Sequence, residues 1–156
     1  MMVNQVERLA EDVALWSVGE IMTADIVEHA CDALVGGLDS QALRELAGAS
    51  PTTFSVDIEE LLRQLAEDFG FPFYEQRGEA GRLAVARVLA RRCVAGELPP
   101  REFVQWLHSR VGHGHEDEQL EALVSLDDSY DITEYTGVGA EEIDRQVMDG
   151  AHRLLQ

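Results

Sequence analysis

The chain has 156 residues, 46% hydrophobic and 27% charged, and its 12 basic residues, all arginine, stand against 30 acidic residues for a net charge of −18. This length and apolar content are typical of one globular domain, and the charge repels phosphates and anionic lipids, so we expect a single domain over residues 1–156 that binds neither nucleic acid nor membranes directly. The absence of lysine excludes a Walker A phosphate loop, a pyridoxal-phosphate Schiff base and a protein-kinase ATP site, because each needs a lysine amine.

Apolar residues recur at spacings of three and four through most of the first half of the chain, which predicts amphipathic helices. The first of these is acidic and has no basic segment or cleavable apolar core, and no apolar run is long enough to span a membrane, so we expect a cytoplasmic protein. Thr23, either Asp39 or Ser40, and Ser55 are candidate N-caps, and glycines mark the ends of the last three helices. The predicted helices cover residues 3–18, 23–35, 40–47 and 56–69.

A connector with four aromatic residues follows these helices: Phe69, Phe71, Phe73 and Tyr74. Such a group is either an exposed anchor for a partner or a corner at which helices share a core. We favour the shared core.

The most apolar predicted helix covers residues 79–95, where apolar residues occupy most of the helical wheel and Arg87 and Arg91 share one strip. A helix that is apolar almost all round is usually buried. We therefore expect it to be the central helix of the fold.

The rest of the second half also shows helical spacing, over residues 100–111, 117–126 and 139–156, whereas residues 127–137 hold turn formers without a clear period. No segment alternates with a two-residue period, so we predict no strand. The expected fold is all-α, a single compact bundle of about seven helices around the helix at 79–95.

Cys31 and Cys93 are the only cysteines, and each lies within a helical pattern. In a reducing compartment such residues are most often small, buried hydrophobic side chains. We therefore expect both to be buried, without a disulfide.

Three histidines, His108, His113 and His115, lie close to acidic residues in the segment HSRVGHGHEDE, and imidazoles near carboxylates suit a divalent transition metal. The spacing matches no HExxH, CxxC or two-His-one-carboxylate pattern, which favours a solvated turn between helices. We predict no metal and no other cofactor. An alternative hypothesis, a metal-dependent enzyme or sensor that uses the His108–Asp117 region, keeps these histidines as its candidate ligands.

No motif indicates catalysis. Alternating oxygen-bearing residues from Asp127 are similar to a calcium loop, but Ile132 and Val138 stand where an EF-hand needs glycine and a bidentate glutamate. Asp149 and His152 share one helix face without the paired Glu-x-x-His motifs of a di-iron bundle. We assign no catalytic residue and favour a chain that is not an enzyme.

Negative charge gathers at both ends of the chain. Residues 1–60 and 116–156 each carry 2 arginines and 12 acidic residues, whereas residues 61–115 carry 8 arginines and 6 acidic residues. Such blocks are either solvated faces that keep the chain soluble or, because their charge exceeds what solubility requires, a surface that attracts a basic protein partner. The predicted partner-binding residues are Glu116, Asp117, Glu118, Asp127, Asp128, Asp131 and Glu134.

Three segments, CDALVGGLDSQALRELAG, CVAGELPPREFVQWLH and SLDDSYD, resemble small acidic helical proteins of unknown function from GC-rich bacteria. Some proteins of similar size and charge are immunity proteins that block a toxin made by the same cell. The resemblance implies an immunity-like, adaptor or inhibitor protein whose acidic face occludes a basic partner. A small-molecule-binding helical protein with a cavity beside Trp16 and Trp106 is the other open alternative.

Overall fold

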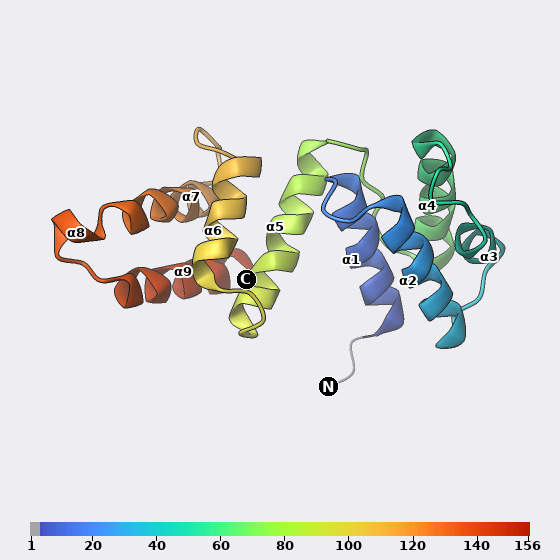
Figure 1. The fold of residues 1–156 in the computed structure, drawn as a ribbon, viewed down its shortest axis with the longest axis horizontal. Coiled ribbons are helices and arrows are strands. Elements are labelled where there is room, and N and C mark those ends of the chain that lie inside the picture. The colour runs from blue at the N-terminus through green and yellow to red at the C-terminus, as the bar shows by residue number, and fades with distance from the viewer. Residues whose placement is uncertain (1–3) are drawn as a thin grey trace. The chain divides into compact units, whose positions relative to one another are not determined.

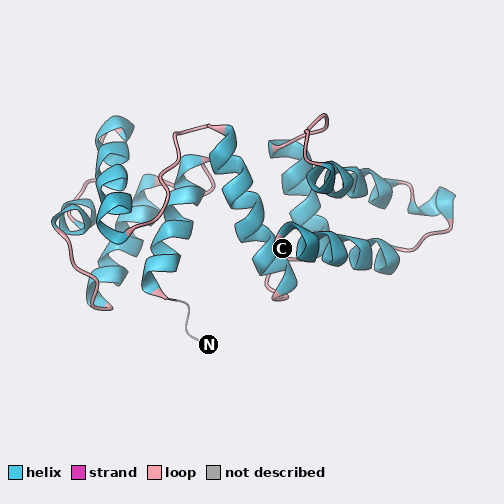
Figure 2. Ribbon diagram, turned by 180° about the vertical axis from the view of Figure 1, so that it is seen from behind, coloured by secondary structure: helices cyan, strands magenta, loops and turns pink. Residues whose placement is uncertain are grey.

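A computed structural model describes residues 4–156, and in this range every regular element is a helix (Figures 1 and 2). The all-α prediction is therefore confirmed. Val3, at the expected start of the first helix, lies outside the described residues. The helices are α1 (Gln5–Ser17), α2 (Thr23–Val35), α3 (Gln41–Ala47), α4 (Ser55–Phe69), α5 (Glu79–Val94), α6 (Pro100–Arg110), α7 (Glu118–Asp131), α8 (Thr133–Thr136) and α9 (Ala140–Leu154).

The helices fall into two compact units, one ending at Gly81 and the other covering Arg82–Gln156. The boundary falls in the first turn of α5, so most of this helix belongs to the second unit. A single domain over 1–156 and a central place for the 79–95 helix stay predictions, and each unit is described by itself.

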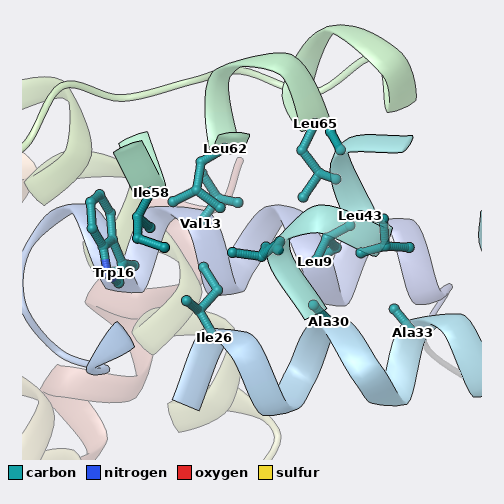
Figure 3. Packing of buried hydrophobic residues seen from close by; sticks show 12 residues of the cluster. Leu9, Val13, Trp16, Ile26, Ala30, Ala33, Leu43, Ile58, Leu62 and Leu65 are labelled. Carbon is teal, nitrogen blue, oxygen red and sulfur yellow. The ribbon is translucent and has the colours of Figure 1, made fainter. Parts of the chain in front are cut away.

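In the first unit, four helices surround one apolar core. Neighbouring helices in the chain contact each other in turn, and α4 returns to contact α1. Figure 3 shows the apolar side chains of all four helices pointing into the same space. Fully or nearly fully buried members of this core include Leu9, Val13, Trp16, Ile26, Ala30, Leu43, Ile58, Leu62 and Leu65.

Local hydrogen bonds explain where the helices of this unit begin and end. Ser40, one of the two expected candidates, caps α3, because its Oγ accepts a hydrogen bond from the Leu43 amide at 3.0 Å. Gly70 ends α4 in the left-handed conformation that glycine adopts without strain. The expected caps at Thr23 and Ser55 are wrong by one residue, since both are the first residues of their helices.

Three of the four aromatic residues of the connector pack against the core, which agrees with the shared core favoured from the sequence. Phe69, Phe71 and Phe73 pack against the buried cluster of the first unit. The Arg63 guanidinium also lies 4.4 Å from the centre of the Phe73 ring, within the range of a cation–π contact.

The second unit is built on mutual contacts among α6, α7 and α9. Figures 1 and 2 show α7 and α9 side by side, joined at one end by the short helix α8. The buried apolar residues of the three helices include Phe103, Val104, Leu107, Leu120, Leu123, Val124, Ile143, Val147, Ala151 and Leu154.

Helix α7 runs to Asp131, beyond its expected end near residue 126, and α8 was not predicted. The added turn is held by tertiary contacts: Tyr130 is buried and its hydroxyl donates a hydrogen bond to Asp144 on α9. Burial and this bond raise the pKa of Tyr130, because both favour the neutral phenol. Such packing stabilises helical structure where local propensity does not.

The two thiols differ in burial, so the expectation that both are buried is wrong for Cys31. Cys93 is buried on α5, with its sulfur 3.7 Å from that of Met148, whereas Cys31 is exposed on α2. Burial, with a smaller contribution from Asp144, raises the pKa of Cys93 and so lowers its content of reactive thiolate.

We expect a disulfide reagent such as Ellman's to label Cys31 promptly in the native protein and Cys93 only upon unfolding. The measurement follows the chromophore that the reagent releases, and we expect one equivalent per chain before denaturant is added and a second equivalent after it. In the control variant Cys31→Ala, the release before denaturant is expected to disappear. Two equally fast phases in the native protein would contradict this assignment.

Within the described residues, none of the helices has the length and apolar character needed to cross a bilayer.

Candidate functional site

Two histidines face each other at the end of α6. His108 lies in the last turn of the helix, and His113 follows in the connection to α7. Gly112 and Gly114 have φ values of 75° and 83°, a conformation that favours glycine and turns the chain back on both sides of His113. The two rings consequently meet edge to face, with centroids 4.9 Å apart.

Carboxylates of α7 surround the two imidazoles. The Nδ1 atom of His108 lies 2.8 Å from an oxygen of Asp127 and 3.8 Å from one of Asp128. His113 uses both ring nitrogens: Nδ1 lies 2.9 Å from Glu121 and Nε2 lies 3.2 Å from Asp128. Glu121 also accepts a hydrogen bond from the Gly114 amide at 2.9 Å, which ties the turn to α7.

The charges in this cluster stabilise each other. A hydrogen bond from each ring nitrogen of His113 to a carboxylate is possible only for the imidazolium, and the pKa of His113 is raised, chiefly by Glu121 and further by Asp128. The pKa of Glu121 is lowered, chiefly by its hydrogen bond to His113. The His113 side chain is 45% exposed and that of Glu121 is 36% exposed, so solvent screens the pair and its contribution to stability is small.

The cluster also has the composition of a metal site. His108, His113 and Asp128 each offer one ligand atom, and these three atoms lie within 4.8 Å of one another. Among the described residues, this is the only group of three or more potential metal ligands that lie so close together. His115, the third predicted histidine, is held differently, because its Nδ1 accepts a hydrogen bond from the Asp117 amide at 3.0 Å. The structure thus brings together two of the three candidate histidines.

The predicted partner-binding residues divide between internal contacts and solvent. Asp117 caps α7 by accepting a hydrogen bond from the Gln119 amide at 2.9 Å. Asp131 pairs with Arg101 at 3.2 Å, and this guanidinium also lies 5.2 Å from the Tyr130 ring centre. Asp127 and Asp128 contact the histidines as described above. The remaining predicted residues, Glu116, Glu118 and Glu134, are exposed.

Sequence reasoning missed Glu121 as a partner of the histidines. The signal was present in its spacing: Glu121 and Asp128 are seven residues apart, which is two helical turns and places both carboxylates on one face of α7. The direction of the turn that presents His113 to this face depends on the two left-handed glycines.

Apolar side chains are exposed where α7 connects to α9. We call residues 131–142 the acidic tip. Its exposed apolar residues are Ile132, Tyr135 and Val138, with Tyr135 exposed to 83%. The exposed acidic residues Glu134 and Glu141 lie in the same segment.

A groove of about 590 Å³ lies between α3 and α4 in the first unit. Most of its lining is polar, including Gln41, Glu45, Gln64 and Asp68. Small-molecule sites are usually lined mainly by apolar and aromatic side chains, so this groove does not favour the small-molecule alternative. Trp16, the expected neighbour of a cavity, lies in the core, and its indole nitrogen bonds to Thr23 at 3.3 Å.

Comparison of the chain with models of protein families, with curated proteins and with solved structures finds no match. What the chain can do is therefore inferred from the chemistry of its own side chains.

Proposed function

We propose that the chain is a non-enzymatic protein-binding module, an immunity-like, adaptor or inhibitor protein that covers a basic surface of its partner with the acidic tip and the exposed carboxylates near the start of α7. Its mechanism is occlusion: the bound tip blocks the partner's surface sterically and neutralises its charge. No catalytic residue is required.

One observation carries this proposal: the sequence contains no arginine between Arg110 and Arg145 while it places eleven acidic residues there. Two of these carboxylates pair with flanking guanidinium groups, Asp131 with Arg101 and Glu142 with Arg145. Within residues 4–156, no hydrogen bond or ion pair joins the exposed side chains of Glu116, Glu118 and Glu134 to a guanidinium group. An excess of like charge in one stretch of the chain favours a partner of opposite charge.

The exposed Tyr135 adds an anchor to this charge. Aromatic residues supply much of the binding energy in protein interfaces when a partner covers them, and polar groups commonly form the rim around them. An apolar centre at Tyr135 with carboxylates beside it in the acidic tip has this organisation. Charge then speeds the encounter and the aromatic ring slows dissociation.

The test begins with affinity capture from a lysate of the organism that encodes the chain, followed by kinetics with the purified captured protein. We expect the association rate to fall steeply as sodium chloride is raised, because the attraction acts between exposed charges and is screened. Tyr135→Ala is expected to weaken the affinity by about 30-fold, which corresponds to about 2 kcal/mol.

Matched variants separate this surface from unspecific attraction. Val35→Ala removes a similarly exposed apolar side chain from the first unit and is expected to leave the affinity unchanged. The double variant Glu134→Gln and Glu141→Gln is expected to slow association. The double variant Glu28→Gln and Asp32→Asn, which loses the same amount of charge from the first unit, is expected to leave the association rate unchanged. An association rate that is independent of salt, or equal losses in both pairs of variants, would refute the proposal.

A further inference from the structure

We propose that His108, His113 and Asp128 bind one divalent transition-metal ion of the zinc type, and that this ion connects the end of α6 to α7. The site is independent of the protein-binding surface, because its residues face one another between these two helices. It differs in chemistry from a calcium or magnesium site, since two of its three ligands are imidazole nitrogens.

The arrangement of the three side chains supports this site. The His113 Nε2 atom lies 3.2 Å from an Asp128 oxygen, and His108 Nδ1 lies 3.8 Å from the other oxygen of the same carboxylate. Neighbouring ligand atoms of a tetrahedral zinc ion are about 3.3 Å apart, given Zn–N and Zn–O bonds of about 2.0 to 2.2 Å. All three ligand atoms lie within 4.8 Å of one another, which is close to this spacing.

A second set of contacts orients the ligands. Histidines that bind a metal through one ring nitrogen usually donate a hydrogen bond from the other nitrogen to a carboxylate. His113 has this arrangement, because its Nδ1 lies 2.9 Å from Glu121 while its Nε2 points toward Asp128. Glu121 is itself held by the Gly114 amide. A metal at Nε2 takes the place of the proton that joins His113 to Asp128 in the metal-free protein.

Asp127 lies beside the three proposed ligands. Its carboxylate lies 2.8 Å from His108 Nδ1, and its side chain is only 17% exposed. When a metal occupies this nitrogen, Asp127 is placed to act as a fourth ligand, and a water molecule fills the position if it does not. Two histidines, one carboxylate and an exchangeable fourth position form a ligand set that zinc accepts.

The first experiment titrates Zn²⁺ into untagged, chelator-treated protein by calorimetry in excess Mg²⁺, which occupies unspecific carboxylate sites. We expect saturation at one Zn²⁺ per chain. Co²⁺ bound in place of Zn²⁺ is expected to show the intense visible bands of four- or five-coordinate cobalt. Binding that Mg²⁺ abolishes, or Co²⁺ bands as weak as those of the hydrated ion, would overturn the proposal and leave a network of ion pairs.

The second experiment assigns the ligands. His113→Gln and Asp128→Asn are expected to abolish stoichiometric binding, and Glu121→Gln is expected to weaken it by about 10- to 100-fold, as is usual for an outer partner of a ligand. His152→Gln is the matched control, because it removes an exposed histidine from α9. Undiminished binding in His113→Gln or Asp128→Asn, or a loss in the control, would contradict the assignment.

A measurement on the unaltered protein covers the case in which a variant does not fold. Zn²⁺ is expected to shift the nitrogen NMR resonances of His113 Nε2 and His108 Nδ1, while those of His152 stay unchanged. Resonance shifts confined to other histidines would place the ion elsewhere and refute this site.

Discussion

Leu123→Ala is expected to lower the free energy of unfolding by about 2 to 5 kcal/mol. It is also expected to make a second substitution, Gly150→Ala, stabilising, although Gly150→Ala alone is expected to be neutral or destabilising. Leu123 is 1% exposed on α7 and packs against Gly150 in the interior of α9. A Cβ atom at Gly150 would lie 2.5 Å from Leu123 Cδ2, closer than real side chains approach. Glycine is therefore needed here to let α7 and α9 pack closely.

The expected reversal follows from two opposing effects of Gly150→Ala. In the natural sequence, crowding against the buried Leu123 costs about 1 to 3 kcal/mol, while the better helix propensity of alanine returns about 1 kcal/mol. In the Leu123→Ala background the atoms that crowd the new Cβ are absent, so only the gain of about 1 kcal/mol remains.

Urea denaturation of the four proteins of this double-mutant cycle, followed by circular dichroism, measures the coupling. We expect Gly150→Ala to destabilise the natural protein or leave it unchanged, and to stabilise Leu123→Ala. If alanine at residue 150 stabilises both backgrounds equally, α7 and α9 do not approach as closely as described.

Leu62→Ala, a substitution in the core of the first unit, is expected to lower the free energy of unfolding by about 2 to 5 kcal/mol. Leu62 is fully buried on α4 and belongs to the cluster that joins α4 to α1, α2 and α3, as Figure 3 shows. Removing its side chain loses apolar burial and leaves a cavity that close-packed neighbours fill only in part.

Val56→Ala on the same helix is the control, because Val56 is 69% exposed. We expect it to change the free energy of unfolding by less than about 0.5 kcal/mol, as is usual for surface substitutions. Urea denaturation followed by circular dichroism compares the two variants. Equal losses from Leu62→Ala and Val56→Ala would show that the core of this unit is not organised around α4 as described.

The proposed metal site and the proposed protein-binding surface use different parts of the same acidic block. Asp128 faces the histidines, whereas Glu134 and Tyr135 lie in the acidic tip beyond the end of α7. A variant such as Asp128→Asn therefore tests the metal without removing the tip, and Tyr135→Ala tests the tip without removing a ligand. The two proposals can fail separately.

The first unit was the more predictable one from sequence. Its helices have strong apolar spacing, and residues such as Ser40 and Gly70 act at the positions where local chemistry places them. Periodicity shows which residues of a helix share a face. It does not show which face a neighbour covers, and so Cys31 was expected to be buried but is exposed.

The second unit was less predictable because its decisive contacts join distant residues. Residues 127–131 show no helical period, and their last turn is stabilised by packing of Tyr130 and its bond to Asp144. The candidate metal site required the same kind of information. No local motif relates His113 to Asp128, because the turn after α6 and the face of α7 meet only in the folded chain.

The amino-acid sequence by itself determined the helical class, the surplus of negative charge and most helix boundaries, since these depend on residue types and on interactions within one or two turns. Only the tertiary structure decided that His108 and His113 share the carboxylate of Asp128, that Gly150 admits Leu123, and that Tyr135 stays exposed. Such features depend on which helix faces meet, and this choice is made by packing the whole unit at once.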